Sequence, residues 1–223
     1  MIRETLPLAA ALIAAAALSP VSGEPPADPA ASLEALGERL FFDVNLSANR
    51  TQSCASCHDP DFGLADPRGM ASPGDDGVSL GDRNAPTASY AALTPPFHRN
   101  AEGEWIGGQF LDGRASTLED QAGGPPLNPI EMGMPDEAAV VARLREDPAY
   151  RAAFPALFGE GVLGDVDAAY DAMTRAIAAF ERTEMFAPFD SKYDRFLRGE
   201  VELTREEELG RILFFSPQFT NCA

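Results

Sequence analysis

Apolar residues recur at helical spacing in several separate stretches of the chain, three or four positions apart. In the stretch from Pro135 to before Pro148, Val140, Val141 and Leu144 are expected to face inward. No stretch of useful length alternates apolar and polar residues with the period of a β-strand. The pattern predicts a mainly α-helical fold, with helices at about 32–42, from Pro135 to before Pro148, at about 166–185, and after a capping box formed by Thr204 and Glu207.

The segments between these helices differ in character. Residues 24–31 are rich in proline, alanine and aspartate without periodicity, and we interpret them as a linker. Residues 59–96 are rich in glycine, proline, aspartate and asparagine, which predicts an ordered but irregular region. Long loops inside a compact domain usually serve a function, so this region is expected to wrap a bound group.

The first 23 residues have the pattern of a secretory signal peptide. Arg3 precedes an apolar run from Leu6 to Leu18, Pro20 ends the run, and small residues follow. An uncleaved anchor is the alternative, although the run is shorter than a membrane span requires. No later segment is apolar enough to cross a bilayer. The protein is therefore expected to be exported, without a membrane span after cleavage, into a compartment that permits covalent chemistry at cysteine.

A short internal repeat joins two distant parts of the chain. Residues 36–42 (LGERLFF) are echoed by residues 209–215 (LGRILFF), and each copy leads toward a cysteine that alanine follows, Cys54 or Cys222. We interpret the second copy as the start of a second domain, which the end of the chain truncates.

Composition excludes two classes of protein. The 223 residues carry 17 lysines and arginines against 35 aspartates and glutamates, a net charge of −18. Such an acidic chain repels phosphate backbones, so nucleic acid is not an expected partner. Three cysteines cannot form a dense disulfide framework.

The sequence Cys54-Ala55-Ser56-Cys57-His58 is the attachment motif of c-type haem. Two thiols at this spacing can add to the two vinyl groups of one haem edge, and the adjacent imidazole can ligate the iron. A redox dithiol and half of a zinc site are the alternatives. The absence of a βαβ pattern argues against the first, and the lack of further ligands against the second.

The opposite face of the iron decides its chemistry. A six-coordinate haem carries electrons, whereas an open position binds peroxide or oxygen. His98, in a polar turn-like context, could serve as the distal ligand or be an ordinary loop histidine. Spacing alone does not choose among the remaining candidates, which are Met70, Met132, Met134, Met173 and Met185.

Several motifs in fixed order resemble those of bacterial di-haem cytochrome c peroxidases and their MauG-like relatives. The resemblance covers nearly everything from about residue 33 to the end. The motifs are residues 36–43 (LGERLFFD), 53–58 (SCASCH), 83–87 (RNAPT), 109–115 (QFLDGRA), 129–132 (PIEM), 180–183 (FERT) and 189–190 (FD).

The resemblance implies two cytochrome c-like haem domains, each mainly helical and with long loops. Residues 32–200 would form the N-terminal domain, whose haem is the peroxidatic one. Residues 201–223 would begin the C-terminal domain, whose haem receives electrons, with Cys222 as the first cysteine of its attachment motif.

The family's functional residues can be placed one by one. Cys54 and Cys57 would anchor haem c, and His58 would be its proximal ligand. Glu131 matches the distal carboxylate that moves a proton during peroxide cleavage. The other matches are Gln121 and Pro125, which would line the distal pocket (Gln121 would otherwise be a helix-surface amide), and Asn84, which would ligate a calcium ion between the domains.

Besides the truncation of the second domain, two differences from the family pattern bear on function. The loop that carries a distal histidine in many members is Ser72–Gly77 here and has none. The tryptophan that lies between the two haems is replaced by Leu111, and Trp105 is either its substitute or a packing residue. Without the histidine, the first haem is expected to be open before any reductive activation. Both differences favour the MauG-like branch.

We therefore expect a periplasmic peroxidase that reduces hydrogen peroxide with electrons from a small donor cytochrome c or a cupredoxin. The acidic surface suits a basic donor. The alternatives are a MauG-like enzyme that oxidises a side chain of a partner protein, a non-enzymatic c-type electron carrier, and a truncated chain that does nothing alone. A homodimer is left open.

Overall fold

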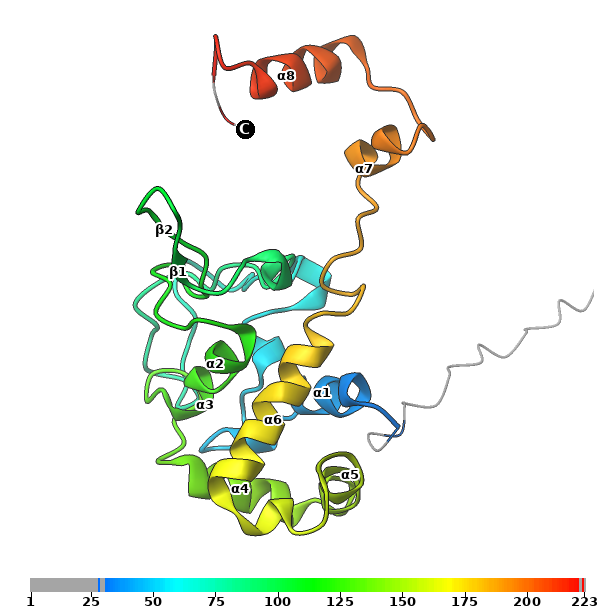
Figure 1. The fold of residues 1–223 in the computed structure, drawn as a ribbon. Helices are drawn as coiled ribbons and strands as arrows, with labels where there is room; N and C mark the ends of the chain where they lie inside the picture. Colours follow the sequence, from blue (N-terminus) through cyan, green and yellow to red (C-terminus); the bar gives the residue numbers. More distant parts are fainter. Residues whose placement is uncertain (1–27, 29–30, 221, 223) are drawn as a thin grey trace, which may run out of the picture.

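The computed structural model describes residue 28, residues 31–220 and residue 222. The predicted signal peptide, residues 1–23, lies outside the described residues, as does the predicted linker except residues 28 and 31. The chain is mainly helical, as predicted (Figure 1). Its elements are α1 (Leu33–Phe41), β1 (His98–Arg99), β2 (Trp105–Ile106), α2 (Leu118–Ala122), α3 (Gly124–Leu127), α4 (Glu137–Glu146), α5 (Pro148–Phe158), α6 (Val166–Phe180), α7 (Lys192–Leu197) and α8 (Arg205–Phe215).

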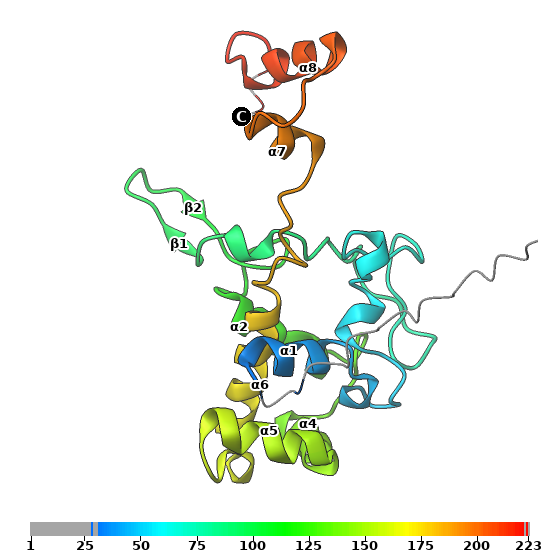
Figure 2. The same ribbon diagram turned by 90° about the vertical axis from the view of Figure 1, so that its right-hand side faces the viewer.

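Helix α6 is the centre of the packed body, and α1, α2 and α4 contact it. Along α6, Tyr170, Met173, Ile177 and Phe180 are buried, as the helical spacing of these apolar residues predicts. A glycine lets α1 approach closely, because a Cβ at Gly37 would overlap the carbonyl oxygen of Ala176. Figures 1 and 2 show α1 lying next to α6 in both views.

Most predicted helix boundaries are confirmed. Ser32 caps α1 by accepting a hydrogen bond from the N–H of Ala35 at 3.1 Å. Helix α4 begins after an Asp136 cap rather than at Pro135, and its three predicted core residues, Val140, Val141 and Leu144, are fully buried.

One helix ends earlier than predicted, and another helix was not predicted. Helix α6 ends at Phe180 and not near residue 185, because a tight turn follows that carries Phe186 into the core. Helix α5 was not predicted, because Pro148 suggested only the end of α4. The same proline occupies the first turn of α5, where its missing N–H costs nothing, and Asp147 caps that helix.

The region 59–96 is largely irregular, as predicted, with short 3₁₀ turns at Pro60–Phe62 and Ala91–Leu93. It is followed by a small hairpin that was not predicted, in which β1 pairs with β2 in antiparallel register. Two-residue strands are too short for an alternating pattern to reveal them. Among the described helices, none is both long and apolar enough to span a membrane.

Helices α7 and α8 lie apart from the packed body (Figures 1 and 2). Thr204 caps α8 in the predicted capping box with Glu207. An ion pair of 2.6 Å from Lys192 to Glu207, and stacked rings of Tyr193 and Phe215 with centroids 6.4 Å apart, hold α7 and α8 together. The interpretation of residues 201–223 as the start of a second domain remains a prediction.

Candidate functional site

The haem-attachment motif lies in a tight 3₁₀ turn, Cys54–Ser56. The backbone N–H groups of Cys57 and His58 both donate to the carbonyl oxygen of Cys54, at 3.1 and 3.0 Å. The backbone N–H of Ser53 donates to the hydroxyl of Ser56 at 3.0 Å. These local bonds place both thiols and the imidazole on a single turn, so the arrangement needs no distant residue to form.

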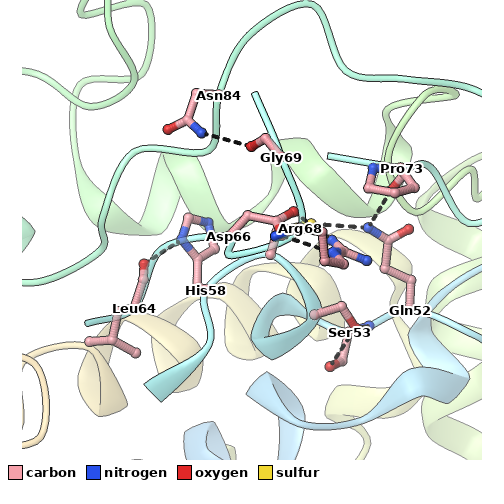
Figure 3. A network of polar contacts seen from close by, with 11 residues as sticks. Gln52, Ser53, His58, Leu64, Asp66, Arg68, Gly69, Pro73 and Asn84 are labelled. Atoms are coloured by element: carbon pink, nitrogen blue, oxygen red, sulfur yellow. Dashed lines mark hydrogen bonds and ion pairs between the residues drawn. The ribbon is translucent and has the colours of Figure 1, made fainter. Parts of the chain in front are cut away.

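The imidazole of His58 is oriented by a backbone carbonyl. Its Nδ1 lies 3.2 Å from the carbonyl oxygen of Leu64, so Nδ1 carries the proton and Nε2 is left as a metal ligand (Figure 3). Burial lowers the pKa of His58, which favours the neutral ring that ligation requires. Leu64 has a φ of 58°, in the left-handed region that non-glycine residues rarely adopt. Sequence reasoning missed this carbonyl, and Gly63 was the only nearby signal.

Polar side chains surround the second cysteine. Gln52 Nε2 lies 3.1 Å from Cys57 Sγ and 3.2 Å from the carbonyl oxygen of Pro73. Arg68 Nη2 lies 3.3 Å from the same sulfur and pairs with Asp66 at 2.6 Å (Figure 3). The Arg68 guanidinium holds the pKa of Asp66 far below its usual range. Gln52 and Arg68 therefore hold the sulfur between segments that precede and follow the motif.

Most of the predicted site residues line one cavity of about 370 Å³, which we call the haem cavity. This volume is within the range of cofactor pockets. Gln121, Pro125 and Glu131 come from α2, α3 and the loop after α3, far along the chain from the attachment motif. The predicted site residues that line the cavity are Cys54, Cys57, His58, Asn84, Gln121, Pro125 and Glu131.

The cavity suits a covalent haem. Cys54, Cys57 and His58 all belong to its lining, and apolar side chains such as Met132 and Ile177 form part of the wall. Three buried polar atoms of the lining, Gln52 Oε1, Ser72 Oγ and Glu181 Oε2, have no hydrogen-bond partner in the described part of the chain. Buried polar atoms of this kind require a partner, and a bound group or water would supply it.

The loop that lacks a distal histidine is held firmly beside this cavity. Asp75 is buried, and its carboxylate accepts the N–H of Asn49 at 2.6 Å and the hydroxyl of Thr51 at 2.6 Å. Its own N–H donates to the carbonyl oxygen of Glu131 at 2.7 Å. Ser72 and Pro73 line the cavity. The loop thus forms part of the wall and supports the backbone of Glu131.

Glu131 is a half-buried carboxyl with two opposing influences. Burial raises its pKa, while the hydrogen bond from Asn128 and the positive charge of Arg114 lower it, and burial prevails. Asn128 Nδ2 donates to Glu131 Oε1 at 2.8 Å. A second cavity, of about 490 Å³, shares Glu131, Asn128 and Arg114 with the first. A carboxyl whose pKa moves toward neutrality is suited to proton transfer.

Glu181 is a cavity residue that sequence reasoning missed. It follows the last residue of α6, is 7% exposed, and lines the cavity. Burial raises its pKa to about 8, against a smaller effect of Arg182. The FERT motif that contains it was noted only as part of the family pattern.

The structure does not bring every candidate to the cavity. His98 is exposed, with Nδ1 2.7 Å from the carbonyl oxygen of Pro96, and it does not line the cavity, which contradicts a distal-ligand role. Trp105 is 65% exposed and stacks on Phe97 with centroids 5.0 Å apart, outside the lining, whereas Leu111 belongs to the lining. Trp105 therefore does not replace the missing tryptophan at Leu111.

Asn84 and Cys222 have simpler surroundings. The amide of Asn84 donates to the carbonyl oxygen of Gly69 at 3.3 Å (Figure 3), and no cluster of three or more acidic, histidine or cysteine side chains suited to a metal is found among the described residues. Calcium binding at Asn84 stays a prediction. Cys222 is an exposed free cysteine beyond α8, away from the cavity.

Comparison with known proteins gives consistent results. A family model described as di-haem cytochrome c peroxidase matches residues 31–202. Methylamine utilization protein MauG of Paracoccus denitrificans (strain Pd 1222) is 59% identical over 196 residues, which are 86% of this chain and 50% of that protein. Cytochrome c peroxidase Ccp of Escherichia coli (strain K12) is 39% identical over 206 residues, 92% of this chain and 39% of that protein.

The solved structure of the diheme peroxidase BthA from Burkholderia thailandensis E264 is similar with a TM-score of 0.79 and 34% identity, over 88% of this chain and 51% of that one. A MauG-like protein associated with microbial copper homeostasis has a TM-score of 0.66 and 34% identity, over 85% and 50%. The chain spans about half the length of these relatives, or less. On the family match over residues 31–202 and these likenesses, the chain belongs to the di-haem cytochrome c peroxidase family.

Proposed function

We propose that this chain forms the peroxide-cleaving half of a di-haem peroxidase that reduces hydrogen peroxide to two waters with two electrons and two protons. The observation that carries the proposal is the convergence, on one cavity, of Cys54, Cys57 and His58 with Glu131. An attachment motif alone would equally suit an electron carrier. A carboxyl with a raised pKa in the same cavity as that motif suits proton transfer to a reacting molecule.

A haem c held at Cys54, Cys57 and His58 would supply the iron that binds peroxide and the electrons that break its O–O bond. Glu131 would take a proton from one peroxide oxygen and return it to the other, which then leaves as water. Gln121 would donate a hydrogen bond that orients the peroxide, since its side chain lines the same cavity. His58, oriented by the Leu64 carbonyl, would ligate the iron.

The fixed loop at 72–77 supports an open iron. Asp75 ties this loop to Asn49 and Thr51, and the loop has no histidine to occupy the distal position. Peroxide would therefore bind without a prior reduction step.

A MauG-like activity, the oxidation of a partner protein's side chain, is the second candidate. The identity of 59% to a MauG, against 39% to a cytochrome c peroxidase, favours it. Leu111 in the position of the inter-haem tryptophan favours it as well.

The remaining parts of the proposal concern the whole protein. The periplasm is the proposed location, and a small cytochrome c or a cupredoxin is the proposed donor, steered by the acidic surface. Cys222 would begin the attachment motif of a second haem, and Asn84 would ligate calcium. Homodimer formation also belongs to this proposal.

The test of the proposed function is Glu131→Gln in the full-length, haem-loaded protein. The amide keeps the size of the side chain but cannot accept the peroxide proton, so peroxide turnover is expected to fall at least about 100-fold, within the range that general acid–base catalysis contributes. The haem absorption spectrum should stay nearly unchanged.

Glu160→Gln is the matched control, because Glu160 is exposed after α5 and lines neither cavity. Unchanged turnover in the Glu131 variant would remove that residue from the mechanism. Turnover of peroxide with a reduced cytochrome, measured beside modification of a partner protein, separates the two candidate activities.

A further inference from the structure

The amide of Asn128 is held in one orientation by the backbone around it. Its Oδ1 accepts the N–H of Ile130 at 3.2 Å. Because a backbone N–H can only donate, the oxygen of the amide must face Ile130, and the NH₂ group must face Glu131. The backbone carbonyl of Asn128 also accepts the N–H groups of Glu131 and Gly133, at 3.0 and 2.9 Å. The turn therefore presents a fixed donor to the carboxyl three residues later.

This donor engages one oxygen of Glu131 and leaves the other. Asn128 Nδ2 lies 2.8 Å from Glu131 Oε1. Glu131 Oε2 makes no hydrogen bond to the described part of the chain. This oxygen is therefore available to accept a proton from a peroxide. Asn128 and Glu131 both line the haem cavity and the neighbouring cavity of about 490 Å³. The pair forms part of the wall between them.

Asn128 opposes the effect of burial on Glu131. A hydrogen bond donated to a carboxylate favours the charged form, whereas burial favours the neutral form. The charged side chains that line the two cavities around Glu131 are Asp82, Arg83, Asp112, Arg114, Asp120 and Glu181. Of these, Arg114 acts in the same direction as Asn128, but its guanidinium stacks on Phe110 and pairs with Asp112 at 2.9 Å.

We propose that Asn128 is a positioning residue for peroxide cleavage, which keeps Glu131 in the carboxylate form and aims its free oxygen at the peroxide. The proposal rests on the proposed function of Glu131. Neither the family pattern in the sequence nor the haem motif singled out Asn128.

Two substitutions separate this role from a structural one. Asn128→Asp keeps an oxygen for the N–H of Ile130 but replaces the donor to Glu131 by a second carboxyl. Asn128→Ser keeps a short acceptor for the turn and has no group that reaches Glu131. In both full-length, haem-loaded variants, the pH midpoint of the peroxide reaction is expected to rise by about one unit or more, since the carboxylate loses a charge-assisted hydrogen bond. The rate at high pH should return to within about threefold of the parent's.

A direct readout is the infrared C=O band of the protonated Glu131 carboxyl, assigned by its loss in Glu131→Gln. Its titration midpoint should rise with the kinetic one. Asn100→Asp is the matched control. Asn100 Nδ2 likewise donates to a carboxylate, Glu104 Oε2, at 3.1 Å, and its Oδ1 accepts a backbone N–H, that of Glu104, at 2.8 Å, in the exposed hairpin outside both cavities. This control should leave both midpoints unchanged.

The outcomes distinguish the two proposals. If Glu131→Gln lowers the rate and the Asn128 variants leave the midpoints unchanged, the role of Asn128 is wrong while the proposed function stands. A rate lowered equally at every pH would show a structural effect and would also overturn the role. If Glu131→Gln has no effect on the rate, the proposed function of Glu131 fails first. In the Glu131→Gln background, a further loss from Asn128→Asp would contradict action through Glu131.

Discussion

Helices α1 and α8 carry nearly the same sequence and have opposite surroundings. In α1, Leu36, Leu40 and Phe41 are fully buried against the body of the domain. In α8, the equivalent Leu209 and Phe214 are 57% and 48% exposed. An apolar helical face thus predicts that a helix packs, but not which surface covers it.

The glycine of each copy explains how α1 packs so closely. A Cβ at Gly37 would overlap the backbone of α6, whereas nothing lies within 4 Å of a Cβ built at Gly210. The LGxxLFF pattern is therefore a docking face whose glycine permits close contact between helices. In α1 that contact also bounds the site, because Ile177 and Glu181 of the α6 region line the haem cavity.

The largest expected effect is that of Gly37→Ala. The new methyl group must push α1 away from α6, so the free energy of unfolding should fall by more than about 5 kcal/mol. Urea unfolding of the haem-loaded 223-residue chain measures it. Gly210→Ala is the control and should change stability by less than about 1 kcal/mol, with a gain in helix propensity. Equal losses in the two variants would remove the distinction between the helices.

The aromatic residues extend the comparison with a smaller effect. Phe41 packs edge to face with Phe180 and Phe186, with centroids 5.5 and 5.4 Å away. Phe41→Ala should therefore cost about 3–5 kcal/mol in the same unfolding measurement. Phe214→Ala, at the equivalent position of α8, should cost less than about 1 kcal/mol because that ring is half exposed. A cost of several kcal/mol at Phe214 would show that α8 is covered in solution.

Glu181 should make the folded protein less stable as the pH rises. Burial raises its pKa to about 8 from an ordinary 4.5, so the folded state binds the proton more tightly than the unfolded state. Its contribution to stability is complete below about pH 4.5 and is lost as the pH rises to about 8, by about 1.4 kcal/mol per pH unit at most. Glu181→Gln should flatten this slope in urea unfolding at pH 5, 6.5 and 8. An unchanged slope would assign the pH dependence to other groups.

The smallest effect is expected at the α7–α8 contact, with the opposite sign. The Lys192 ammonium lowers the pKa of Glu207 through a hydrogen bond, so this contribution is present above about pH 4.5 and is lost as the pH falls through the lowered pKa. Lys192→Gln should return the pKa of Glu207 toward its ordinary value in an NMR titration. Added salt should have part of the same effect, because the pair is exposed. If neither Lys192→Gln nor added salt changes the pKa of Glu207, the ion pair does not contribute to the stability of the α7–α8 contact.

Prediction from sequence succeeded where the determinants are local. The Cys54 turn is closed by its own backbone bonds, and the caps at Ser32 and Thr204 lie within one helical turn of the N–H groups that they accept. Prediction failed at α5 because Pro148 suits both the end of one helix and the start of the next. The sequence did not reveal the contacts of Leu64 and Asn128. The first depends on the direction of the Leu64 carbonyl, and the second on the orientation of the Asn128 amide.

The sequence by itself determined the helical pattern and the covalent haem motif, because helix periodicity and a thiol spacing of three positions are properties of short segments. It also named Glu131, but only through family resemblance. Only the tertiary structure decided that Glu131, Gln121 and Glu181 share a cavity with His58, and that His98 and Trp105 do not. The physical reason is that packing of α1 and α2 on α6 brings together segments that lie far apart in the chain, and burial there changes the pKa values of their carboxyl groups.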